Sequence, residues 1–111
     1  MREADRESRE QIRALASDPV RVTLARQSLS DLLAWKLTKL QLCDAIVAWV
    51  DAGRPVKQVV LHSYGGLRGR TAFELKPRLL DRLFYVKVTI FTTPHNPDSL
   101  LVISAHPDHP R

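Results

Sequence analysis

Residues 56–90 carry a series of side chains that could do acid–base or anion-binding chemistry: Lys57, His62, Glu74, Arg78, Tyr85 and Lys87. Histidine exchanges protons near neutral pH, and lysine and arginine attract phosphate. Taken singly, each residue is more often a solvated charge or a half-buried ring on a sheet. A function for the group therefore depends on whether the fold brings these side chains together.

The glycine-rich segment SYGGLRGR, residues 63–70, contains three of the four glycines of the chain, together with Arg68 and Arg70. Its backbone N–H and guanidinium groups could hold a phosphate. An ordinary hairpin loop explains the composition at least as well. The segment lacks the strand-to-helix context and the lysine of a phosphate-binding loop.

The composition fits one domain, residues 1–111, with 44% hydrophobic and 26% charged residues. Seventeen Lys and Arg against twelve Asp and Glu give a formal charge of +5. This excess of positive charge favours an anionic partner such as nucleic acid or an acidic protein.

Cys43 is the one cysteine in the sequence, and it lies in an apolar segment. We expect a buried thiol, without a disulfide framework, a metal site or a cofactor. The first ten residues alternate charges where a signal peptide needs an apolar stretch. No apolar run approaches the about 20 residues that span a bilayer. A cytoplasmic protein without membrane contact is expected.

The elements that position the polar side chains begin with helices. Good helix formers predict a helix over residues 4–16, and Asp18-Pro19 ends it. Residues 20–24 alternate apolar and polar, as in an edge strand or an extended connector, and we favour the connector. Leucines at spacings of three and four predict a second helix over residues 24–37. We place Leu29, Leu32 and Leu33 on its apolar face.

Thr38 begins the clearest helix, because Gln41 three residues later completes a capping box. Apolar residues from Leu42 to Val50 form one face, and residues 51–53 supply the stop signal. We expect Trp49 to pack in the core rather than stack on a ligand.

After these helices, the spacing of apolar residues becomes typical of β-strands. Residues 56–62 and 71–75 predict two strands, and residues 83–92 predict the strongest, with Tyr85 and Lys87 on its polar face. Residues 100–105 predict a final strand, followed by a flexible tail over residues 106–111. The expected fold is α+β: two to three N-terminal helices packed on one face of a small, mainly antiparallel sheet of three to four strands.

The runs VRVTLARQSLSDLLAWKL, LCDAIVAW, PVKQVV, FELKPRL, FYVKVTI and LLVISAH resemble the MqsR (motility quorum-sensing regulator) toxin family of type II toxin–antitoxin systems. Their order and spacing match over nearly the whole chain, with longer loops around residues 65–70 and 92–99. The resemblance implies a RelE-like fold and a ribonuclease that cuts messenger RNA and is inhibited by a cognate antitoxin. It also implies site roles for Lys57 and Tyr85. The family's glutamine on the second strand and lysine on the last one correspond most nearly to Glu74 and His106.

Metal-free RNA cleavage needs a base for the 2′-hydroxyl proton, a cation beside the phosphorane and an acid for the leaving 5′-oxygen. Following the resemblance, Glu74 is the expected base and His106 the expected acid, with His62 as the alternative acid. Lys57 and Lys87 would stabilise charge, and Tyr85 would position the phosphate or act as an acid. Arg68, Arg70 and Arg78 are expected to contact the RNA backbone.

Two other functions fit the sequence less well. A non-catalytic basic module could bind RNA or an antitoxin with the same fold. A DNA-binding domain has less support, because the segment TKLQLCDAIVAWVDAG is too apolar and too poor in Arg and Lys for a recognition helix.

Overall fold

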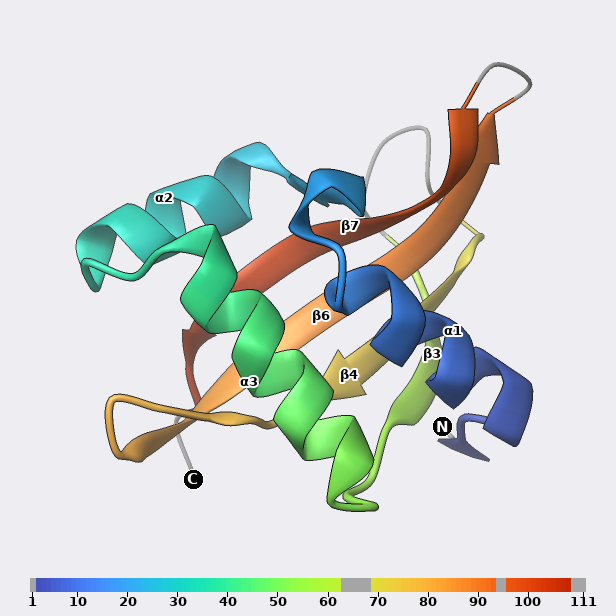
Figure 1. Ribbon diagram of the computed structural model, residues 1–111, viewed down its shortest axis with the longest axis horizontal. Coiled ribbons are helices and arrows are strands. Elements are labelled where there is room, and N and C mark those ends of the chain that lie inside the picture. Colours follow the sequence, from blue (N-terminus) through green and yellow to red (C-terminus); the bar gives the residue numbers. More distant parts are fainter. Residues whose placement is uncertain (1, 63–68, 94–95, 109–111) are drawn as a thin grey trace.

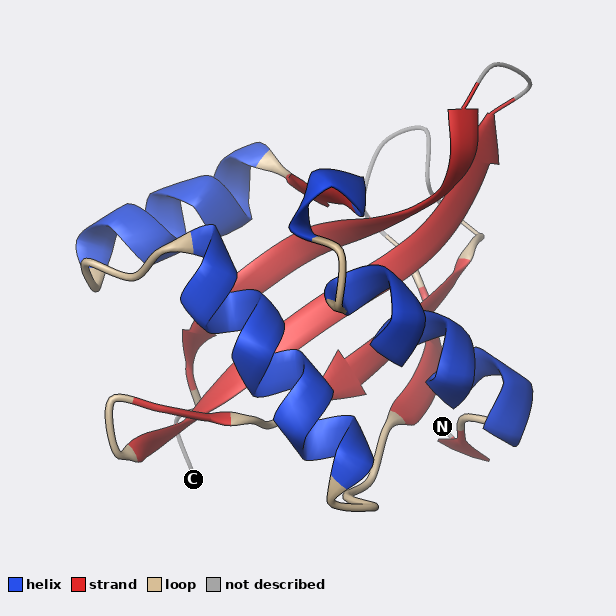
Figure 2. Cartoon of the chain, in the orientation of Figure 1, coloured by secondary structure: helices blue, strands red, loops and turns tan. Residues whose placement is uncertain are grey.

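The computed structural model describes residues 2–62, 69–93 and 96–108. Within these residues the chain forms three α-helices and one seven-stranded sheet. The helices lie together on one face of the sheet (Figure 1, Figure 2). None of the described helices combines the length and apolar character needed to cross a bilayer.

Helix α1, Arg6–Ala16, begins where the Asp5 side chain accepts a hydrogen bond from the Ser8 N–H at 2.7 Å. Its Ile12, Leu15 and Ala16 are buried. The helix predicted over residues 4–16 is thus confirmed, with its start moved to the residue after the N-cap.

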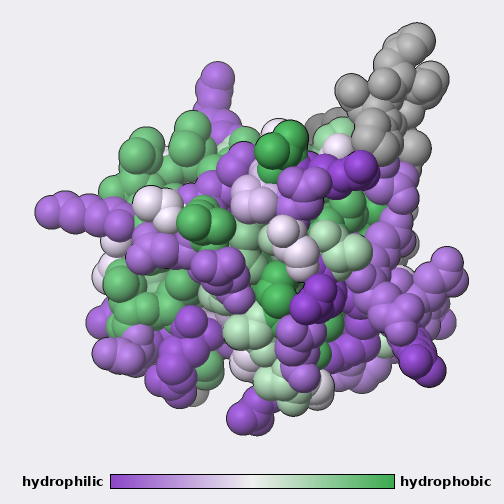
Figure 3. Space-filling view, viewed as in Figure 1, coloured by the Kyte–Doolittle hydropathy of each residue, from purple (hydrophilic) through white to green (hydrophobic). Residues whose placement is uncertain are grey.

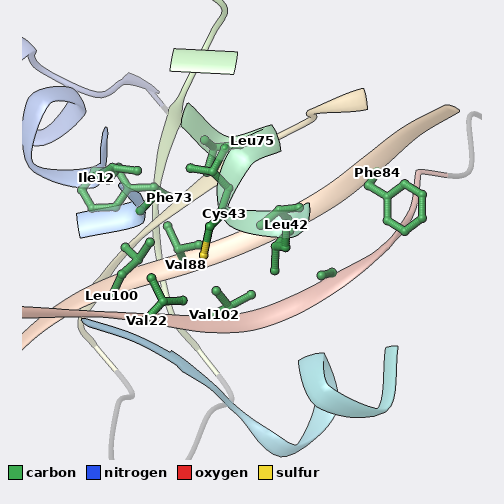
Figure 4. Packing of buried hydrophobic residues seen from close by; sticks show 14 of the residues in the cluster. Ile12, Val22, Leu42, Cys43, Phe73, Leu75, Phe84, Val88, Leu100 and Val102 are labelled. Carbon is green, nitrogen blue, oxygen red and sulfur yellow. The ribbon is translucent and has the colours of Figure 1, made fainter. Parts of the chain in front are cut away.

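Helix α3, Lys39–Asp51, has the predicted capping box between Thr38 and Gln41. Its apolar stripe crosses the middle of the sheet, where Leu42 and Cys43 meet the central strands (Figure 4). Burial raises the pKa of the Cys43 thiol, an effect that the nearby Lys39 charge reduces. The prediction of a buried thiol is confirmed.

Helix α2, Arg26–Ala34, packs against the last strand and is less buried than its leucine pattern predicts. Only Leu32 of the three named leucines is buried, whereas Leu29 and Leu33 are 48% and 70% exposed. Figure 3 shows hydrophobic surface among hydrophilic side chains on this helix-covered face. The buried Ser28 hydroxyl donates a hydrogen bond to the Val102 carbonyl, and the Asp31 carboxylate accepts one from the Ala105 N–H, so α2 satisfies backbone groups of the last strand.

Five strands follow α3: β3 (Lys57–Val60), β4 (Thr71–Leu75), β5 (Arg78–Leu79), β6 (Arg82–Thr93) and β7 (Asn96–Pro107). Neighbouring strands in the series β3-β4-β6-β7 are antiparallel, and β5 forms a hairpin with β6. The register shifts between Lys87 and Val88, which marks a β-bulge in this pairing. The strands predicted over residues 71–75 and 83–92 are confirmed, and the final strand is longer than predicted at both ends.

Two further strands contradict the expected small, mainly antiparallel sheet. Strand β1, Arg2–Glu3, pairs with β3, and β2, Val22–Leu24, runs parallel to β7 at the opposite edge. A short 3-10 helix, Pro19–Arg21, precedes β2. The sheet is therefore mixed, with order β1-β3-β4-β6-β7-β2, and its strands do not all follow the helices.

The preference for a connector over residues 20–24 was wrong. A strand of two or three residues is too short to show an alternating pattern, and a partner nearly eighty residues away decides its conformation. Val22 is buried beside Leu100 and Val102 (Figure 4).

Candidate functional site

The register of the sheet brings Lys57, Glu74 and Lys87 into one row on three neighbouring strands. Lys57 pairs with Glu74, and Glu74 pairs in turn with Lys87. Tyr85, two residues before Lys87 on β6, pairs with His106 on β7. We call these five residues the polar cluster. Because residues next to Tyr85 and Lys87 on β6 are buried under the helices, the cluster lies on the opposite, helix-free face.

The Glu74 carboxylate lies at the centre of the cluster. The Tyr85 hydroxyl donates a hydrogen bond to Glu74 Oε2, and Lys87 Nζ lies 4.0 Å from the same oxygen. Lys87 Nζ also lies 5.8 Å from the centre of the Tyr85 ring. The side chains of Lys87 and Glu74 are 27% and 20% exposed, so solvent reaches both.

Tyr85 is held in its protonated form. Burial is the largest cause that raises the pKa of its hydroxyl, followed by the hydrogen bond to Glu74 and the negative charges of Glu74 and Asp108. A phenolate here would lose solvation and face two carboxylates. At neutral pH, Tyr85 is therefore a hydrogen-bond donor to Glu74.

His106 stacks on Tyr85, with ring centres 5.4 Å apart and an interplanar angle of 21°. Its Nδ1 lies 3.0 Å from the Pro107 carbonyl oxygen. A carbonyl only accepts hydrogen bonds, so Nδ1 is the donor in this contact. His106 and Pro107 belong to β7, although the sequence placed them in a tail.

A pocket of about 370 Å³ opens beside the cluster. It is lined by Trp49, Pro55, Lys57, Glu74, Lys76, Tyr85 and Asp108. We call it the polar pocket. Lys76 Nζ lies 3.3 Å from Asp108 Oδ2 on its rim. Two lysines, two carboxylates and a phenol thus line the space. Lys87 and His106 are outside this lining but contact its Glu74 and Tyr85.

The turn after α3 forms one wall of the polar pocket. Gly53 adopts φ +72°, a left-handed conformation that favours glycine, and the N–H groups of Gly53 and Arg54 donate to the Val50 and Trp49 carbonyls. The chain then reverses, so that the Pro55 carbonyl accepts a hydrogen bond of 2.7 Å from Trp49 Nε1. The same turn leads directly into β3 and Lys57.

His62 lies away from the polar cluster. It follows β3 by two residues, whereas Lys57 is the first residue of that strand. The four residues of β3 span about 10 Å, and His62 follows them in a bend, at the other end of the strand from Lys57. The structure therefore brings His106, and not His62, to Tyr85.

The expected RNA-contact arginines are dispersed. Arg70 is exposed, and its carbonyl accepts a hydrogen bond of 2.9 Å from the Leu61 N–H, at the His62 end of β3. Arg78 lies on the β5–β6 hairpin, where its Nη1 donates to the Asp81 carbonyl at 3.3 Å. Arg68 lies outside the described residues.

Sequence reasoning missed Trp49, Lys76 and Asp108 as pocket residues. Trp49 does pack against the core, as predicted, while another part of the same residue lines the pocket. The signal for this second role is its place in the last turn of a helix, next to the Gly53-Arg54-Pro55 stop. In the described part of the chain, no group of three or more His, Cys, Asp or Glu side chains is placed to hold a metal ion.

None of the family models, curated proteins or solved structures compared with this chain matches it.

Proposed function

We propose that this chain is an endoribonuclease that cleaves single-stranded messenger RNA without a metal ion and acts as the toxin of a type II toxin–antitoxin system. The observation that carries the proposal is the Tyr85–Glu74 hydrogen bond between two lysines and beside His106. The resemblance of the sequence to MqsR toxins and the net charge of +5 support it.

In the proposed reaction, the Glu74 carboxylate takes the proton of a ribose 2′-hydroxyl. The 2′-oxygen attacks the adjacent phosphorus, and Lys57 and Lys87 stabilise the charge of the phosphorane. The bond to the 5′-oxygen breaks as His106, in its imidazolium form, donates a proton to that oxygen. The products are a 2′,3′-cyclic phosphate and a free 5′-hydroxyl.

Tyr85 has a positioning role in this scheme. An acid role would leave a phenolate beside Glu74 and Asp108, the arrangement that raises the pKa of Tyr85. Donation of a hydrogen bond to Glu74 creates no phenolate, and it fixes the direction of the carboxylate. Of the two roles considered for Tyr85, orientation of the neighbouring groups is thus favoured.

A non-catalytic module that binds RNA or an antitoxin is the second candidate. The observation that favours it is the close contact of Glu74 with Tyr85 and Lys87, because such contacts also stabilise a sheet surface without any chemistry. The toxin would act in the cytoplasm, where messenger RNA and a cognate antitoxin are its partners. A binding module would share the partners but not the cleavage.

The test is incubation of purified, folded protein with a long single-stranded RNA in the presence of a chelator. The proposal predicts fragments that end in 2′,3′-cyclic phosphates and begin with 5′-hydroxyls. Intact RNA from protein shown to be folded and free of antitoxin would favour the binding module. Expression of the chain alone should arrest growth if it is a toxin, and growth that matches an empty-vector control would contradict that role.

A further inference from the structure

Trp49 contributes to the walls of two pockets. One is the polar pocket, which also contains Lys57, Glu74 and Tyr85. The other, of about 440 Å³, has an apolar floor that includes Ala45, Ala48 and Leu83. We call this second space the side pocket. Because Trp49 lines both pockets, they are neighbours, and a flexible chain that occupies one can continue into the other.

The position of Trp49 is fixed from two sides. Its Nε1 donates to the Pro55 carbonyl at 2.7 Å, and the residue packs against the core cluster under α3. An aromatic ring that is already ordered loses little conformational entropy when a ligand stacks on it. Nucleobases stack on such rings, and recognition of single-stranded RNA commonly uses this contact.

The side pocket combines its apolar floor with two guanidinium groups. Arg54 and Arg78 are among its lining residues, and no carboxylate is among those that the structure describes there. Leu83 on the floor is 41% exposed, an unusual position for a large apolar residue. An apolar surface flanked by positive charge is complementary to a nucleobase with its phosphate.

The backbone at both arginines is held by hydrogen bonds or by a tight turn. The Arg54 carbonyl accepts a hydrogen bond of 2.8 Å from Arg9 Nη1, and its N–H donates to the Trp49 carbonyl. Arg78 belongs to a hairpin whose two loop residues, Leu80 and Asp81, have φ of 52° and 59°. These values are typical of a tight type I′ turn, which fixes the strand on which Arg78 lies.

We propose that the side pocket, with Trp49 as its aromatic wall, binds the nucleobase next to the phosphodiester held in the polar pocket, while Arg54 and Arg78 bind the flanking phosphate. This inference rests on the proposed ribonuclease function, because single-stranded RNA is the occupant to which it commits. Trp49 is then a residue that determines substrate binding and base preference, in addition to its packing role. Arg78 keeps the RNA-contact role expected from the sequence, and Arg54 joins it.

The test separates binding from cleavage. The chain has two tryptophans, so a Trp35→Phe variant leaves Trp49 as its single tryptophan fluorophore. Trp35 contacts Phe84 and Arg82 instead of the two pockets, and phenylalanine keeps an aromatic ring there. Short single-stranded 2′-deoxy oligonucleotides serve as probes, because they lack the 2′-hydroxyl and cannot be cleaved by the proposed route.

The proposal predicts saturable quenching of Trp49 fluorescence by these probes. Trp49→Leu should raise KM for RNA about tenfold, as loss of one stacked base does, with a smaller effect on kcat. Arg54→Gln and Arg78→Gln should each weaken oligonucleotide binding. Each should also reduce the slope of log binding constant against log salt concentration by about the contribution of one phosphate contact. Arg21→Gln, which removes an exposed positive charge outside both pockets, is the matched control.

The outcomes separate failure of the base site from failure of the ribonuclease function. If RNA is cleaved but neither Trp49→Leu nor the two arginine variants changes KM or quenching, the side pocket is not a base site, and the ribonuclease function stands. If the probes quench Trp49 while RNA remains intact, the side pocket binds nucleic acid, and the ribonuclease function is wrong. If the probes leave Trp49 fluorescence unchanged, the side pocket does not bind nucleic acid. The arginine variants lie on the surface, so they test the site even if Trp49→Leu fails to fold.

Discussion

Replacement of Tyr85 by phenylalanine removes one hydroxyl group and keeps the ring that stacks on His106. A hydrogen bond to a charged acceptor contributes about 1.5–3 kcal/mol. The Glu74 side chain is 20% exposed, and Lys87 Nζ stays 4.0 Å from its oxygen, so water and Lys87 compensate in part. We therefore expect Tyr85→Phe to lower the free energy of unfolding by about 1.5 kcal/mol, the low end of this range.

The expected effect on catalysis is of similar size. A residue that only orients the base should lower the single-turnover rate about tenfold, which corresponds to about 1.4 kcal/mol. A general acid should contribute about 10²–10⁴-fold. The assay is single-turnover RNA cleavage by wild-type and Tyr85→Phe protein between pH 5 and pH 9, with urea unfolding as the stability measurement. The shape of the pH–rate profile should be the same for both proteins.

A double-mutant cycle with Glu74→Gln provides the control. Because Tyr85 acts through Glu74, Tyr85→Phe should have almost no further effect on the rate in the Glu74→Gln background. A loss above about 10²-fold in Tyr85→Phe, together with a lost alkaline limb of the pH profile, would identify Tyr85 as the acid and refute the positioning role.

Further predictions follow from the fold and the site. His106→Ala should slow cleavage by about 10²–10⁴-fold, and His62→Ala should leave the rate within about twofold; equal losses would place His62 in the site. Thr38→Ala should cost about 1 kcal/mol in urea unfolding through loss of the capping box, and Ser28→Ala about 1–3 kcal/mol, because its buried hydroxyl holds α2 to β7. The raised pKa of Tyr85 stabilises the folded state. This stabilisation is fully present below pH 10.0, the ordinary pKa of tyrosine, and is lost as the pH rises above that value. Wild-type protein should therefore lose stability above pH 10 more steeply than Tyr85→Phe, in unfolding measured against pH.

The sequence predicted the elements whose signals are local. The capping box at Thr38, the apolar stripe of α3 and the alternation along β6 each lie within one segment, and all three occur in the structure, with Leu42, Cys43 and Ile46 as the buried residues of the stripe. The edge strands β1 and β2 were not predicted because they carry no local signal. Two or three residues carry no periodicity, and their pairing with distant strands decides their conformation.

The site depends on register, which single-segment patterns do not contain. Lys57, Glu74 and Lys87 were recognised as candidates, but their common row requires two particular strand pairings. A shift of one residue in either pairing would remove one of the three side chains from the row. The predicted tail begins at His106 because Pro107 is a signal that ends a strand, whereas β7 continues to Pro107. The choice between His62 and His106 likewise needed the pairing of Tyr85 with His106.

The central claim is that the Glu74 carboxylate is the base of an RNA-cleaving site. The most direct measurement is the single-turnover cleavage rate of Glu74→Gln relative to wild-type protein at neutral pH, with both shown to be folded by unfolding curves. Glutamine keeps the shape of the side chain and its ability to accept a hydrogen bond from Tyr85, but it cannot take a proton from a 2′-hydroxyl. We predict a rate lower by about 10²–10⁴-fold. A rate equal to that of the wild-type protein would contradict the claim.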